Sequence, residues 1–92
     1  MSKIKSPTAQ RYELNRAMAL LRMYCRANKL DHVVSRYGDG VLWYMDNPTT
    51  GASLQIYLAP YDTKFGAEYL AQIIIDRWEH TERRMLRGAS ND

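Results

Sequence analysis

The chain has 92 residues, of which 46% are hydrophobic and 25% charged, and its formal net charge is +3. This length predicts a single domain, residues 1–92, and this composition excludes a largely disordered chain. No apolar run is longer than that of Val41–Met45, which is far shorter than the roughly 20 residues that cross a bilayer, so we expect no membrane partner.

The first predicted element is an amphipathic helix over about residues 7–28. Ser6 and Pro7 are typical of a helix start, because a serine side chain accepts from free N–H groups and proline suits the first helical position. Leu14, Leu21 and Cys25 recur on one side at helical spacing, and basic residues occupy the opposite side. This helix is therefore expected to bury one side and expose the other.

Three short strands are predicted next, over about residues 32–37, 41–46 and 53–59. Glycines and a proline mark the two connections, at residues 38–40 and 47–51. Such short connections join antiparallel neighbours, so the strands form a meander.

The faces of this sheet follow from a pairing of Tyr37 with Val41 and of Met45 with Leu54. With this register, the face toward the core collects Val33, Val41, Trp43, Met45, Leu54, Ile56 and Leu58. The outer face collects His32, Val34, Arg36, Leu42, Tyr44, Asp46, Ser53, Gln55 and Tyr57.

A second helix is predicted over about residues 63–87. Asp62 is expected to cap its start, Leu70, Ile74 and Trp78 form an apolar stripe, and Gly88 is expected to end it. The whole chain thus predicts an α+β fold of order α-β-β-β-α, with two helices on one face of a three-stranded antiparallel meander.

The charge is unevenly distributed along the chain. Residues 1–29 hold seven Lys or Arg against one Glu, a net +6, whereas residues 30–62 carry a net −3 and the remainder is neutral. Within the first helix, four cations lie on one side and no carboxylate accompanies them. We call this set the basic ridge: Arg11, Arg22, Arg26 and Lys29.

The basic ridge predicts a partner that carries negative charge, since solvated helix faces usually mix both signs. A simple solvated helix back is the competing interpretation. On the sheet, Tyr44 and Tyr57 are candidate stacking platforms for bases, although one face of an antiparallel sheet is commonly wet. The candidate partner-binding residues beside the ridge are Asp31, His32, Arg36, Tyr44 and Tyr57.

Catalytic and metal-binding patterns are missing from the sequence. Cys25 falls on the apolar side of the first helix, which predicts a small buried hydrophobe rather than a nucleophile. With only His32 and His80 besides this cysteine, no zinc-ligand spacing arises. We therefore expect no enzyme, no metal, no cofactor and no small-molecule substrate.

The opening MSKIKSPTAQRYELN and the centre VLWYMDNPTTGASLQIY resemble a small phage-encoded anti-CRISPR protein that acts on type I-F CRISPR–Cas systems. The resemblance implies a non-enzymatic inhibitor in the cytoplasm of the infected bacterial host. Its implied partners are the subunits of the RNA-guided surveillance complex, which also offers guide-RNA phosphates, and its effect is to block hybridisation to target DNA. No site residue is carried over, because the resemblance includes no diagnostic motif.

Two alternatives stay open. One is a stand-alone RNA- or single-stranded-DNA-binding module that uses the basic ridge for phosphates and the tyrosines for stacking. The other is a small enzyme or a homodimeric structural protein that associates through the outer sheet face.

Overall fold

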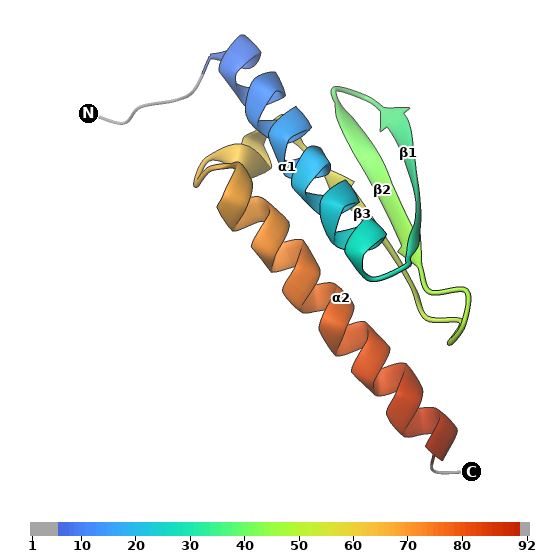
Figure 1. Ribbon diagram of the computed structural model, residues 1–92. Helices are drawn as coiled ribbons and strands as arrows, with labels where there is room; N and C mark the ends of the chain where they lie inside the picture. Colours follow the sequence, from blue (N-terminus) through green and yellow to red (C-terminus); the bar gives the residue numbers. More distant parts are fainter. Residues whose placement is uncertain (1–5, 91–92) are drawn as a thin grey trace.

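The computed structural model describes residues 6–90 and confirms the predicted α+β fold (Figure 1). Each strand lies within one residue of its predicted bounds. In chain order the elements are α1 (Pro7–Ala27), β1 (Asp31–Tyr37), β2 (Gly40–Asp46), β3 (Ser53–Leu58), the 3₁₀ turn η1 (Pro60–Thr63) and α2 (Ala67–Ser90).

Both ends of α1 are stabilised by local hydrogen bonds. At its start, the Ser6 hydroxyl accepts from the N–H of Ala9 at 3.1 Å, which confirms the predicted cap. At its end, Lys29 adopts a left-handed conformation with φ of 57°, and the N–H of Leu30 donates to the carbonyl of Cys25 at 2.8 Å. This is the arrangement of a Schellman cap, in which glycine is the usual left-handed residue.

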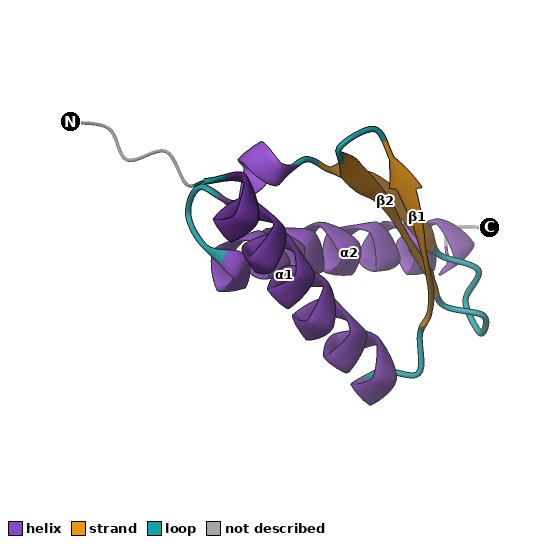
Figure 2. Ribbon diagram, turned by 90° about the horizontal axis from the view of Figure 1, so that it is seen from above, coloured by secondary structure: helices purple, strands orange, loops and turns teal. Residues whose placement is uncertain are grey.

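The three strands form one antiparallel sheet of order β1-β2-β3, and both helices lie on the same face of it (Figures 1 and 2). The core between these layers buries both tryptophans, Trp43 and Trp78, completely. The indole N–H of Trp43 donates to the sulfur of Met45 at 3.3 Å. Leu21 of α1 and Ile74 of α2 pack in the same core.

The register of the first hairpin differs from the predicted one by one residue. Tyr37 pairs with Gly40 rather than Val41, because the turn contains only Gly38 and Asp39. Gly38 has φ of +60°, as the first central position of a type II′ turn requires. The prediction for β2 and β3 is confirmed, with Trp43 opposite Ile56 and Met45 opposite Leu54.

This register reverses the predicted faces of β1 alone. His32, Val34 and Arg36 pair with the inward residues of β2 and lie on the helix side of the sheet. Val33, expected in the core, lies on the outer face and is 56% exposed. A shift of one residue moves every side chain of a strand to the other face.

Both predicted ends of the second helix are wrong. The chain first makes η1, in which the Asp62 carboxylate accepts from the N–H of Ala59 at 2.8 Å and so does not cap α2. Gly66, with φ of +98°, then turns the chain into α2 at Ala67. At the other end α2 continues through Gly88 to Ser90, because one glycine lowers helix stability by only about 1 kcal/mol.

Candidate functional site

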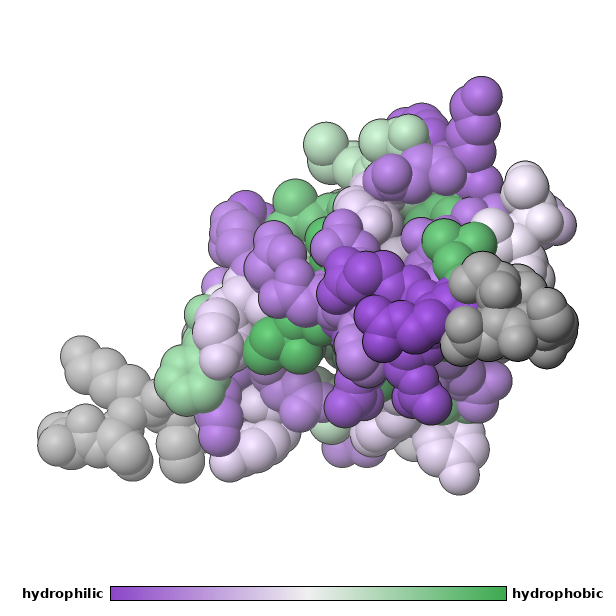
Figure 3. Space-filling view, turned by 90° about the horizontal axis from the view of Figure 1, so that it is seen from below, coloured by the Kyte–Doolittle hydropathy of each residue, from purple (hydrophilic) through white to green (hydrophobic). Residues whose placement is uncertain are grey.

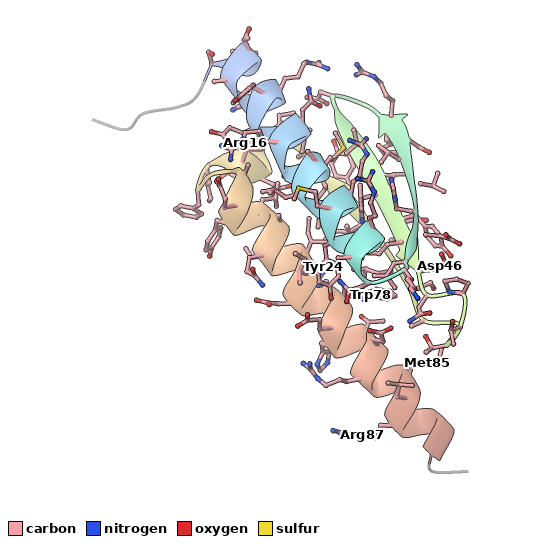
Figure 4. All side chains as sticks on the ribbon, in the orientation of Figure 1. Arg16, Tyr24, Asp46, Trp78, Met85 and Arg87 are labelled. Atoms are coloured by element: carbon pink, nitrogen blue, oxygen red, sulfur yellow. The ribbon has the colours of Figure 1, made fainter. Side chains whose placement is uncertain are left out.

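Two charged side chains on one side of α1 contact the first residues of α2. The Glu13 carboxylate accepts from the N–H of Ala67 at 3.2 Å, in place of the predicted Asp62 cap. Arg16, which is labelled in Figure 4, forms an ion pair with Glu68 at 2.5 Å. The backbone N–H of Glu68 and then this arginine lower the pKa of the Glu68 carboxyl. The only carboxylate of α1 is thus engaged with α2, on a side away from the basic ridge.

The basic ridge follows the other exposed side of α1 and ends at its C-terminal cap. All four of its side chains are exposed, and within residues 6–90 none of them has an ion-pair or hydrogen-bond partner. Arg11 and Arg22 are eleven residues apart, which is about three helical turns, so they share one side of the helix. The ridge therefore presents cations that the described part of the fold leaves uncompensated.

A groove opens between this side of α1 and the sheet. Its volume is about 500 Å³, and Arg11 from α1 and Arg36 from β1 both line it. Arg36 reaches this position because of the hairpin register, which places it on the helix side of the sheet. The structure thus brings Arg36 to the groove beside Arg11, and separates it from the outer-face tyrosines with which it was grouped.

His32 is the candidate site residue for which the structure gives a different role. Its imidazole stacks on the indole of Trp43, with ring centroids 5.2 Å apart and an interplanar angle of 8°. The side chain is half-buried on the helix side of the sheet. The expectation that His32 lies on the outer face is therefore wrong, because the register turns this residue onto a core tryptophan.

The remaining candidates, Asp31, Tyr44 and Tyr57, lie on the outer face of the sheet. The Tyr57 ring meets Tyr37 edge-on at 5.8 Å between centroids. A Cβ on Gly40 would lie 2.9 Å from that same ring, so the glycine makes room for Tyr57. These tyrosines are exposed or half-buried, but the sheet separates them from the groove.

An aromatic cluster at the junction of η1 and α2 was not predicted. Phe65 and Tyr69 meet edge-on at 5.2 Å, and the ammonium of Lys64 lies 4.7 Å from the centre of the Tyr61 ring. Tyr61, Phe65 and Tyr69 are all more than half exposed. The three aromatic residues are spaced four apart in the sequence, which is the spacing of residues on one side of a helix. The sequence does not indicate that Tyr61 also lines the groove, because this depends on where η1 lies in the fold.

Two weakly acidic groups, the half-buried Tyr24 and the buried Cys25, hold their protons. Tyr24, which is labelled in Figure 4, donates to Glu79 at 3.0 Å, and burial and this carboxylate raise the pKa of Tyr24. Burial raises the pKa of Cys25 to about 11, and Asp31 adds to the effect. The prediction that Cys25 is a buried hydrophobe is confirmed, since 1% of it is exposed.

No group of three His, Cys, Asp or Glu side chains among the described residues is placed to hold a metal ion. Within the same part of the chain, neither helix has the length and apolar character needed to cross a membrane. Comparison with protein-family models, with curated proteins and with solved structures finds no match to this chain.

Proposed function

We propose that this protein is a non-enzymatic binding protein that holds an anionic partner along the basic ridge and the adjoining groove. The observation that carries the proposal is the set of unpartnered cations on α1. Glu13 and Arg16 are engaged with α2, whereas Arg22 and Arg26 are exposed and have no partner among the described residues. Guanidinium groups of this kind bind carboxylates or phosphates through paired hydrogen bonds.

The partner in this proposal is taken from the sequence resemblance to anti-CRISPR proteins. It is the type I-F CRISPR RNA-guided surveillance complex, whose hybridisation to target DNA the bound protein blocks in the bacterial cytoplasm. An RNA-guided complex presents both protein surfaces and the phosphates of its guide. A ridge of cations next to a groove can bind either an acidic patch on a protein subunit or the phosphates of the guide RNA.

A stand-alone nucleic-acid-binding module is the competing function, and the geometry disfavours it. Such a module would use the ridge to contact phosphates and Tyr44 and Tyr57 to stack on bases. The ridge and the two tyrosines, however, lie on opposite sides of the sheet. A free strand would have to pass around the edge of β1 to reach both. The module predicts tight binding to free oligonucleotides that weakens steeply with salt.

The test is a gel shift of target DNA with purified type I-F complex at increasing protein concentration. We expect the protein to prevent the DNA shift, to co-elute with the complex, and to bind a free oligonucleotide weakly. Undisturbed DNA binding at excess protein would overturn the proposal. Tight, salt-sensitive binding to the free oligonucleotide without inhibition would support the module instead.

Charge reversal locates the surface used. The double substitution Arg22→Glu with Arg26→Glu is expected to weaken binding to the complex by about tenfold or more. Its thermal midpoint should stay near that of the wild type, since exposed charges contribute little to stability. The matched control is Arg77→Glu with Arg84→Glu, two exposed arginines of α2, which should leave binding unchanged. Equal loss in both doubles would show non-specific attraction by net charge.

A further inference from the structure

The groove between α1 and the sheet has the size of a ligand site. Its volume of about 500 Å³ lies within the range typical of sites that enclose small ligands or peptide side chains. It opens where the first half of α1 runs past the turn end of the β1–β2 hairpin, and the chain after β3 closes one end with Pro60 and Tyr61. Both walls are built on regular elements, so the site is formed before a partner binds.

The floor of this groove is aliphatic. Leu14 and Met18 come from α1, and Val34 and Val41 come from the sheet. Leu14, Met18 and Val41 are each buried to more than nine-tenths, so they present a small apolar surface at the bottom. Such a surface matches an aliphatic side chain, because contact removes apolar area from water.

The rim of the groove is predominantly cationic. Arg11 and Arg36 stand on the helix wall and the strand wall respectively, both are exposed, and neither has a partner among residues 6–90. Asp39 is the one carboxylate among the described residues that line the groove, and Asn15 adds an amide on the side of Arg11. Two guanidinium groups above an aliphatic floor complement a ligand that joins carboxylates to an apolar side chain.

We propose that this groove holds an acidic peptide segment of the partner protein, with one aliphatic side chain on the floor and adjacent carboxylates at Arg11 and Arg36. This inference rests on the proposed function and names which part of the partner enters the site. A peptide suits the groove better than a nucleic acid does. Among the described residues, the floor has no aromatic platform for a base, and Tyr61 is the only aromatic residue in the lining.

The experiment measures fluorescence polarisation of a short labelled peptide in which leucine and aspartate alternate. Two control peptides replace either every aspartate by lysine or every leucine by serine, and a short single-stranded RNA is the fourth probe. We expect the leucine–aspartate peptide to bind about tenfold or more tightly than the three other probes. Equal affinity for the serine-containing peptide would show that no aliphatic side chain binds on the groove floor, which would contradict the proposal. Preferential binding of the RNA would overturn the assignment of a peptide.

Substitutions in the protein then locate the peptide. Arg11→Glu and Arg36→Glu should each weaken peptide binding by about tenfold or more, whereas Arg77→Glu on α2 should not. Circular dichroism establishes that each variant is folded, and Arg11→Gln and Arg36→Gln provide milder substitutions if a charge reversal unfolds the chain. Unchanged peptide affinity in the folded Arg11 and Arg36 variants would overturn the inference.

Failure of this inference is distinguishable from failure of the proposed function. If the complex binds Arg11→Glu and Arg36→Glu normally but not the double variant at Arg22 and Arg26, the contact lies at the Arg22 and Arg26 part of the ridge and the groove inference is wrong. If the peptide binds as expected but the complex does not, the partner assignment is wrong and the groove inference stands.

Discussion

The Cys25 thiol shows how burial of one titratable side chain makes stability depend on pH. The folded core raises its pKa to about 11, whereas an unfolded cysteine titrates near 8.5. The folded state thus disfavours the thiolate, so this stabilisation is complete below about pH 8.5 and declines as the pH rises toward 11.

We expect the free energy of unfolding to fall with increasing pH more steeply in the wild type than in Cys25→Ala. Between pH 8 and 10 the wild type should lose about 2 kcal/mol more free energy of unfolding than the alanine variant does. Urea unfolding at several pH values measures it. The alanine variant is less stable at neutral pH because it loses packing, but only the slope tests the titration. Parallel profiles would show that the thiol does not ionise on unfolding in this range.

At the scale of single elements, the end of α1 combines a strained backbone with a basic ridge residue. Lys29 has φ of 57°, a left-handed conformation that costs residues with a Cβ roughly 1 kcal/mol. The cap it completes brings Leu30 and Cys25 into the core. The same residue therefore serves the fold through its backbone and the proposed site through its ammonium group.

These two roles separate in a pair of variants. Lys29→Gly should stabilise the protein by about 0.5–1 kcal/mol, because glycine adopts this conformation without steric cost. Lys29→Ala removes the same charge but retains the strain, so its thermal midpoint should lie below that of the glycine variant by several degrees, about 2–8 °C. Both should weaken binding to the proposed partner complex equally. Calorimetry measures the first difference, and equal midpoints would show that the left-handed conformation carries no strain.

At the scale of the whole molecule, α2 extends beyond the layers that it helps to bury. The fold measures 53 × 25 × 24 Å, and the long axis follows the 24-residue helix α2 (Figure 1). Seen from below, the surface is mostly hydrophilic, with hydrophobic side chains in separate patches (Figure 3). Asn47 donates to Glu82 at 2.6 Å, and the side chains of residues 83–87 are exposed.

Amide hydrogen exchange should follow this division. We expect slow exchange for residues 70–78 of α2, where Leu70, Ile74 and Trp78 face the core, and fast exchange for residues 83–87, where few apolar contacts oppose fraying. Mass spectrometry of peptides from the two segments measures the rates. Uniform protection along α2 would indicate that a further surface covers its end in solution.

Most of the fold was predictable from the sequence because its signals are local. Ser6 before Pro7, the helical spacing of Leu14 and Leu21, and the alternation in β3 each act over a few residues, and the structure confirms them. The candidate site was predictable only along α1, where one helix determines the placement of Arg11, Arg22 and Arg26. Glu13 at the start of α2 and Arg36 at the groove depend on contacts between distant segments.

The sequence by itself determined the order of the elements, the antiparallel meander and the one-sided charge of α1. The tertiary structure decided the register of β1, and with it the side of the sheet on which His32 and Arg36 lie. The segment Gly38–Gly40 admits turns of two or three residues, so its own chemistry does not choose between them. Tertiary contacts favour the two-residue turn. In this register His32 stacks on Trp43, and Gly40 occupies a position where a Cβ would lie 2.3 Å from the carbonyl oxygen of Leu58.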